Sequence, residues 1–133
     1  INIVLPSEPA EQTVLSNGAI FSKDRYGNSE IGIVWDAPNS HFVNERMGDS
    51  LRACRERLKL VHLSDTGQKV YRHDPVGAGT VPFAEIPPVL AEIGHRELSM
   101  LEIISHDADR DIASSVERLV EFGFAGGTAR SAT

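Results

Sequence analysis

The sequence has a single cysteine, no long hydrophobic run and no cluster of basic residues. With Cys54 alone, an internal disulfide and a paired-cysteine zinc or redox motif are excluded. No apolar stretch approaches the roughly 18 to 20 residues that a transmembrane helix requires. The 13 lysines and arginines are scattered and are outnumbered by 19 acidic residues, which gives a net charge of −6. We therefore expect a cytoplasmic protein that binds neither a membrane nor nucleic acid.

Four short apolar runs are typical of buried β-strands. They are rich in β-branched residues and do not alternate cleanly with polar ones, which favours strands covered on both faces. The predicted strands are Ile1–Leu5, Ile31–Trp35, Leu58–Leu63 and Leu98–Ile104, and the predicted helices span 46–57, 82–94 and 109–123. This succession predicts repeated βα units, with parallel strands and right-handed crossovers. The pattern is weakest across residues 11–30.

Two architectures agree with four βα units. They would make half of a (β/α)8 barrel, whose usual size is about 250 residues, or a small open α/β sheet. Half a barrel exposes two sheet edges, so we expect a homo-oligomer or pairing with the remainder of the barrel. The chain also begins directly in a strand-like run, which suggests a fragment of a longer protein.

Each predicted unit carries a carboxylate or a histidine at or just after the end of its strand. In chain order these residues are Glu8, Asp36, His62 and Glu102. A single strand-end histidine or aspartate is often only structural, but parallel strands of a barrel end at one rim, where four such groups would converge. Carboxylate oxygens and an imidazole nitrogen are suitable ligands for Mn²⁺, Mg²⁺, Co²⁺ or Zn²⁺. Asp65, just beyond the third strand, is expected to orient a neighbour or cap the following loop instead.

Two loops offer candidate substrate-binding groups. In YRHDPVGAG, after the third strand, two glycines allow a tight turn and a close approach to a ligand. DAPNSHF follows the second strand and would lie on the same rim. An ordinary surface loop is the alternative for YRHDPVGAG. The candidate substrate-binding residues are Arg72, His73, Asn39 and His41.

The segments GIVWDAPN, LVHLSDT, RHDPVGAGTVPF and LEII, in this order and at this spacing, resemble the xylose-isomerase-like TIM barrels. This superfamily comprises sugar phosphate isomerases and epimerases, inosose dehydratases and metal-dependent apurinic endonucleases. The resemblance implies an α/β fold in which the chain supplies the last four units of a (β/α)8 TIM barrel. Residues 1–124 would form the carboxyl-terminal half of the barrel domain, and residues 125–133 a flexible tail.

The resemblance also implies roles for individual residues. Asp36, His62 and Glu102 match metal-ligand positions, whereas Glu8 is displaced from the strand end where the family has a glutamate. Arg72 and His73 occupy the place of family residues that contact substrate. Asn39 stands where the family often has a histidine.

The activity implied by the resemblance is that of a divalent-metal-dependent sugar or sugar-phosphate isomerase or epimerase. A small polyhydroxy carbonyl substrate would react by proton transfer through a metal-stabilised enediolate, with Glu102 and Glu8 as the catalytic carboxylates. An inosose-type dehydratase and a degenerate, non-catalytic sugar-binding barrel are the alternatives. Asn39 and the acidic net charge argue against the endonuclease branch.

Overall fold

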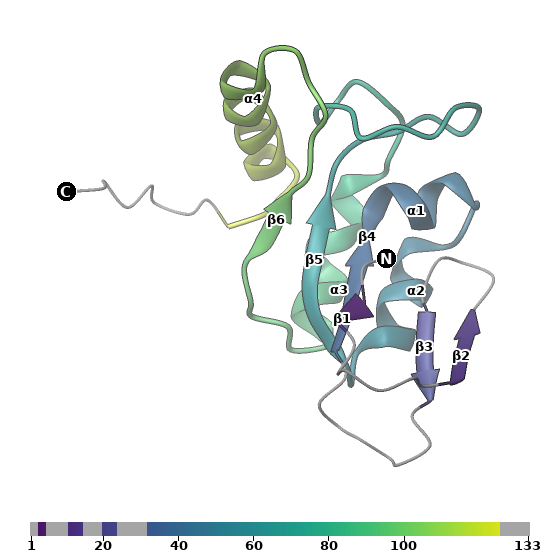
Figure 1. Cartoon of the computed structure of the whole chain (residues 1–133). Coiled ribbons are helices and arrows are strands. Elements are labelled where there is room, and N and C mark those ends of the chain that lie inside the picture. Colours follow the sequence, from purple (N-terminus) through teal and green to yellow (C-terminus); the bar gives the residue numbers. More distant parts are fainter. Residues whose placement is uncertain (1–2, 5–10, 15–19, 24–31, 126–133) are drawn as a thin grey trace.

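The computed structural model of the protein describes residues 3–4, 11–14, 20–23 and 32–125. Its main sheet has the strand order β1-β4-β5-β6, and β2 and β3 form a separate antiparallel ribbon (Figure 1). The strands are β1 (Ile3–Val4), β2 (Glu11–Val14), β3 (Ile20–Lys23), β4 (Gly32–Asp36), β5 (Leu58–Leu63) and β6 (Ser99–Leu101). The helices are α1 (Ala37–Phe42), α2 (Met47–Cys54), the short 3-10 helix η1 (Phe83–Glu85), α3 (Ile86–Glu92) and α4 (Ala108–Glu121).

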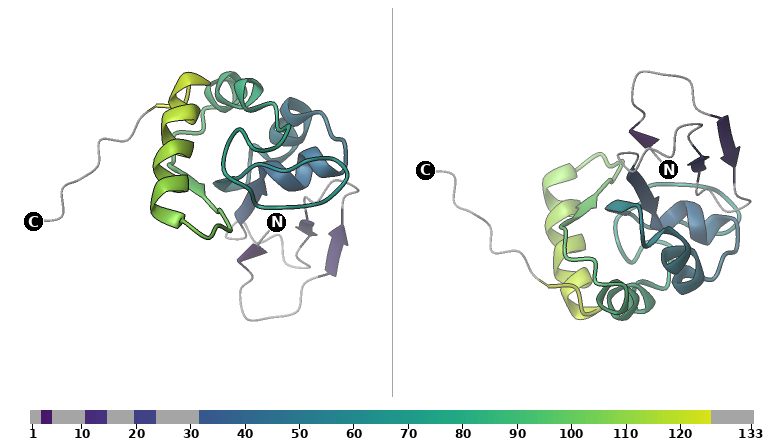
Figure 2. Two further views of the ribbon diagram at one scale, coloured as in Figure 1. Left: turned by 90° about the horizontal axis from the view of Figure 1, so that it is seen from above. Right: turned by 90° about the horizontal axis from the view of Figure 1, so that it is seen from below.

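Strands β4, β5 and β6 are parallel, as the repeated βα pattern predicts. The register pairs Asp36 with His62 and His62 with Met100, so the three strands end at the same edge of the sheet. Seen along the strands, helices α2, α3 and α4 form an arc around one side of the sheet (Figure 2). This part of the chain therefore has the layered βα arrangement that was predicted.

The first predicted βα unit differs from the prediction in strand direction and in its connection. Strand β1 pairs with β4 in the antiparallel direction, with Ile3 opposite Ile33, so the expectation of a parallel first strand is wrong. A parallel pair needs a long crossover, usually a helix, whereas the described residues between β1 and β4 form the β2-β3 ribbon. Apart from Ala125, the predicted tail lies outside the described residues.

The core lies between the sheet and helices α2 and α3. Trp35 of β4 is 1% exposed, and its indole Nε1 donates a 2.8 Å hydrogen bond to Ser50 Oγ of α2. Leu51, Val61 and Phe83 are also buried in this layer. Because side chains alternate across a strand, Asp36, next to Trp35, must point to the opposite face, away from α2.

Two helix ends, the start of α4 and the end of α3, follow their sequence signals. Asp107 precedes α4, and its side chain accepts a hydrogen bond from the Arg110 backbone N–H at 3.4 Å, as expected of an N-terminal cap. Gly94 follows α3 with a φ of 72°, the left-handed conformation that terminates a helix at glycine. Within the described ranges, no helix is both long and apolar enough to cross a membrane.

Candidate metal site

Three of the predicted ligands converge at the carboxyl-terminal edge of the parallel strands. Asp36 is the last residue of β4, His62 is the penultimate residue of β5, and Glu102 directly follows β6. One ligand atom from each residue lies within 4.8 Å of the other two. Their strands point in the same direction, which brings residues far apart in sequence to one place (Figure 1).

His62 and Glu102 are directly paired. His62 Nδ1 lies 2.9 Å from Glu102 Oε2, and the two side chains are 10% and 42% exposed, respectively. The Glu102 backbone N–H donates a 3.0 Å hydrogen bond to the Leu63 carbonyl, which extends the β5-β6 ladder by one residue. The backbone thus fixes Glu102 beside His62 and leaves its carboxylate the most accessible of the three candidate ligands.

Asp36 is almost completely buried, with 4% of its surface exposed. Its Oδ2 accepts a 3.4 Å hydrogen bond from the Tyr71 hydroxyl, whereas the buried Oδ1 has no hydrogen-bond partner. Burial raises the pKa of the Asp36 carboxyl above its ordinary value, and the negative charge of Glu102 acts in the same direction. A buried carboxylate oxygen without a partner is costly unless a donor or a cation faces it.

These residues fit a divalent cation. Two carboxylates and one imidazole supply hard oxygen and borderline nitrogen ligands, and Asp36 also has a buried oxygen, Oδ1, without a hydrogen-bond partner. The set contains no thiolate, which disfavours a structural zinc site of the cysteine type.

A second group of side chains borders Asp36 and Glu102. Both ring nitrogens of His73 have protein partners, with Nδ1 3.0 Å from Ser64 Oγ and Nε2 2.9 Å from the Tyr71 hydroxyl. His73 Nδ1 also lies 3.9 Å from Glu102 Oε2. Tyr71 and Ser64 are not among the site residues that the sequence predicts. The spacing of Tyr71 and His73 could have indicated that Tyr71 is a site residue, because the side chains of residues two apart in extended backbone lie on the same side.

The loop that carries these residues is anchored by Asp65, which is 1% exposed. Its carboxylate accepts hydrogen bonds from three backbone N–H groups, those of Thr66 (2.9 Å), Gly77 (2.8 Å) and Val81 (3.0 Å). The expectation that Asp65 holds the following loop is confirmed. Gly79 fits beside it because a Cβ at this position would lie 2.4 Å from the Thr66 carbonyl oxygen.

The other predicted substrate-binding residues lie around this edge. Asn39 and His41 are in α1, directly after Asp36, and His41 Nε2 is 2.8 Å from Thr80 Oγ1. Arg72 is exposed beside His73. Glu8 lies outside the described residues. Substrate contacts by these residues remain predictions.

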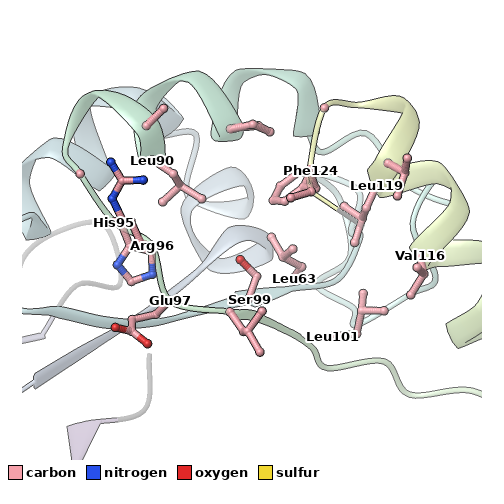
Figure 3. A pocket seen from close by; sticks show the side chains of 17 residues that line it. Leu63, Leu90, His95, Arg96, Glu97, Ser99, Leu101, Val116, Leu119 and Phe124 are labelled. Carbon is pink, nitrogen blue, oxygen red and sulfur yellow. The ribbon is translucent and has the colours of Figure 1, made fainter. Parts of the chain in front are cut away.

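A cavity of about 630 Å³ in the described part of the chain lies elsewhere (Figure 3). It lies between α3, β6 and α4, and Leu63, Leu101 and Leu119 contribute to its mostly apolar wall. Leu63 and Leu101 are the sequence neighbours of His62 and Glu102, so they point to the opposite face of the sheet. The cavity is therefore separate from the polar cluster.

Comparisons with known proteins agree with this arrangement. A family model described as "Xylose isomerase-like TIM barrel" matches residues 22–122. A D-psicose 3-epimerase from Enterocloster bolteae is 29% identical over 84 residues, which cover 63% of this chain and 26% of that protein. The chain thus matches about a quarter of the length of this curated relative.

Two solved structures are also similar. One is a D-tagatose 3-epimerase-like protein with a TM-score of 0.60 and 23% identity, aligned over 71% of this chain and 35% of that one. The other is a xylose isomerase domain protein from Planctomyces limnophilus, with a TM-score of 0.56 and 25% identity over 68% of this chain and 37% of that one. The described fold is therefore that of part of such a barrel.

Proposed function

Because the chain belongs to the xylose isomerase-like TIM barrel family, we propose that it carries the metal-binding edge of a divalent-metal-dependent sugar or sugar-phosphate isomerase or epimerase. The observation that carries this proposal is the convergence of Asp36, His62 and Glu102 within 4.8 Å, with a buried Asp36 oxygen that has no partner. This arrangement supports a ligand role more strongly than a structural one, since a structural carboxylate would have both oxygens paired.

Asp36 Oδ1, His62 and Glu102 would hold the cation, with Mn²⁺, Mg²⁺, Co²⁺ and Zn²⁺ as candidates, and Glu8 is proposed as a further ligand. When bound, the cation would supply Lewis-acid stabilisation of the negative charge that develops on substrate oxygens. Asp36 and His62 are buried and would stay fixed during the reaction.

We assign proton transfer to Glu102, with Glu8 as its proposed partner. Glu102 has the most exposed side chain of the three clustered ligands, so a substrate can approach it. Its Oε2 is held by His62 Nδ1 and also lies near His73, which fixes the carboxylate in one orientation. From there it would remove a proton from the carbon beside the substrate carbonyl and return it.

The substrate we propose is a small polyhydroxy carbonyl compound of the ketose type. One similar protein is described as a D-psicose 3-epimerase and another as a D-tagatose 3-epimerase-like protein, and both names refer to ketoses. Arg72, His73, Asn39 and His41 are the proposed hydrogen-bonding groups around it. They lie beyond the ends of β4 and β5, on the edge that also carries the metal ligands.

Metal analysis and hydrogen exchange test this function directly. We expect the protein to bind a divalent cation and to incorporate deuterium from D₂O at the carbon next to the carbonyl of a ketose, measured by NMR. Chelation with EDTA should stop the exchange, and adding back Mn²⁺ or Co²⁺ should restore it.

The same experiment separates the alternatives. An inosose-type dehydratase would release water and give an unsaturated or tautomerised product. A non-catalytic sugar-binding barrel would bind a ketose without any exchange at carbon. A protein that neither binds a cation nor exchanges a carbon-bound proton would contradict the proposed function for the sugars tested.

We also propose that further βα units of the same barrel cover β6, either from the same polypeptide or from a second copy. Within the described ranges, β6 pairs with β5 alone and its other edge has no strand partner. Leu98 and Ile104, on either side of β6, are 82% and 76% exposed. Such an edge with flanking apolar residues favours strand pairing.

The mass of the native protein tests this proposal. If the 14.5 kDa chain is expressed alone, we expect oligomers in native mass spectrometry. Replacing Leu98 with lysine should shift the distribution toward monomer, whereas replacing Lys59 on β5 with alanine should not. A stable wild-type monomer at high concentration would contradict self-association.

A further inference from the structure

We propose that Tyr71 is a positioning residue that, together with His73 and Ser64, holds one oxygen of Asp36 and leaves the other free for the cation. The inference rests on the proposed function, because it takes Asp36 as a metal ligand. It concerns the three residues that link Asp36 to the loop after β5.

A continuous path of polar contacts reaches Asp36 from inside the protein. Ser64 Oγ lies 3.0 Å from His73 Nδ1, and His73 Nε2 lies 2.9 Å from the Tyr71 hydroxyl. The Tyr71 hydroxyl in turn donates to Asp36 Oδ2 at 3.4 Å. The last contact is the longest, so the position of the tyrosine ring decides how well it is made.

With Asp36 ionised and the His73 ring neutral, the protons along this path have a single arrangement. An ionised Asp36 only accepts hydrogen bonds, so the single hydroxyl proton of Tyr71 is used there. The hydroxyl oxygen must then accept from His73 Nε2–H. The neutral ring has no second proton, so its Nδ1 accepts from the Ser64 hydroxyl. Every donor thus has one acceptor, and the hydrogen bonds polarise one another in the same sense.

Packing holds the Tyr71 ring in place although the residue is 37% exposed. Its ring makes an edge-to-face contact with Phe42 of α1, with centroids 5.4 Å apart, and another with His73 at 5.1 Å. Helix α1 begins directly after Asp36. The hydroxyl and the carboxylate are therefore supported by the same helix, and their separation is set by packed groups.

The hydrogen bond from Tyr71 makes the two oxygens of Asp36 different. With Oδ2 bound to Tyr71, the carboxylate cannot rotate without losing that bond, and the partnerless Oδ1 is the oxygen left for a cation held together with His62 and Glu102. This favours coordination through one oxygen. Groups that orient a metal ligand in this way typically change metal affinity by about 10- to 100-fold when they are removed.

Replacement of Tyr71 with phenylalanine tests the inference, because it removes the hydroxyl and keeps the ring contacts. We expect the Kd for Co²⁺ to rise about tenfold. The visible absorption bands of bound Co²⁺ should change as well, since Asp36 could then bind through both oxygens. Val70→Ala, an exposed neighbour in the same loop, is the matched control and should leave Kd and spectrum unchanged.

His73→Leu in both backgrounds tests the path itself. If His73 acts through the tyrosine hydroxyl, its replacement should raise Kd less in the Tyr71→Phe protein than in the wild type. Additive effects, or an unchanged Kd or spectrum in Tyr71→Phe, would overturn the positioning role while leaving the metal site standing. A wild-type protein that binds no Co²⁺ would overturn both this role and the proposed function.

Discussion

Replacing Asp36 with asparagine is expected to raise the Kd for a divalent cation by more than about 100-fold. This exceeds the largest change in metal affinity that is typical when a residue that only orients a ligand is removed. The amide has the same shape but no negative charge, and its weaker oxygen would face the cation. Isothermal titration with Mn²⁺ or Co²⁺ measures the loss, and deuterium exchange into a ketose should fall with it.

The stability of metal-free Asp36→Asn distinguishes a ligand from a structural carboxylate. Burial raises the pKa of Asp36, which means that folding disfavours its ionised form. Removing the charge should therefore leave the metal-free melting temperature unchanged or higher. Such a gain in stability with loss of function is typical of functional sites.

Asp49→Asn is the matched control. Asp49 loses the same charge, but its side chain is 57% exposed and pairs with Arg46 and Arg52 on the surface of α2. We expect wild-type metal affinity and nearly wild-type stability, since surface ion pairs contribute about 0 to 1 kcal/mol. If Asp36→Asn bound metal as tightly as this control, Asp36 would not be a ligand.

The convergence of the three candidate ligands could be predicted because it depends on where the strands end. Strand β5 was predicted with its observed bounds, and β4 and β6 were located to within a few residues. Once three parallel strands are aligned, Asp36, His62 and Glu102 must come together at one edge, whatever the details of packing. The fold class follows from the same pattern, and the family match confirms it.

The direction of β1, helix α1 and the contact between Tyr71 and Asp36 could not be predicted from local sequence patterns. A short apolar strand such as β1 has no periodicity that distinguishes parallel from antiparallel pairing. The sequence does not predict helix α1, because APNSHF is short and contains proline and asparagine. Tyr71 lies 35 positions from Asp36, and only the return of the loop after β5 brings their side chains together.

That loop is held mainly by Asp65, and Asp65→Asn should lower the free energy of unfolding by about 3 kcal/mol. In the wild type, Oδ1 accepts from the N–H groups of Thr66 and Val81, and Oδ2 accepts from Gly77. An asparagine has one acceptor oxygen, so its amide group must face a backbone donor, and the charge that strengthens all three bonds is lost. Urea denaturation followed by the fluorescence of the single tryptophan, Trp35, measures the change.

Asp74→Asn is the control that separates anchoring from a general effect of charge in this loop. Asp74 pairs with Asp65 through backbone hydrogen bonds of 2.8 Å in both directions, and in the described part of the chain its carboxylate has no hydrogen bond. Its replacement should change the free energy of unfolding by less than about 0.5 kcal/mol.

Hydrogen exchange shows where stability is lost. Faster exchange at Gly77 and Val81 in Asp65→Asn, but not in Asp74→Asn, would place the loss in the loop. Because this loop carries Tyr71 and His73, metal affinity should fall in the same variant, whereas equal effects of both substitutions would contradict the anchoring role.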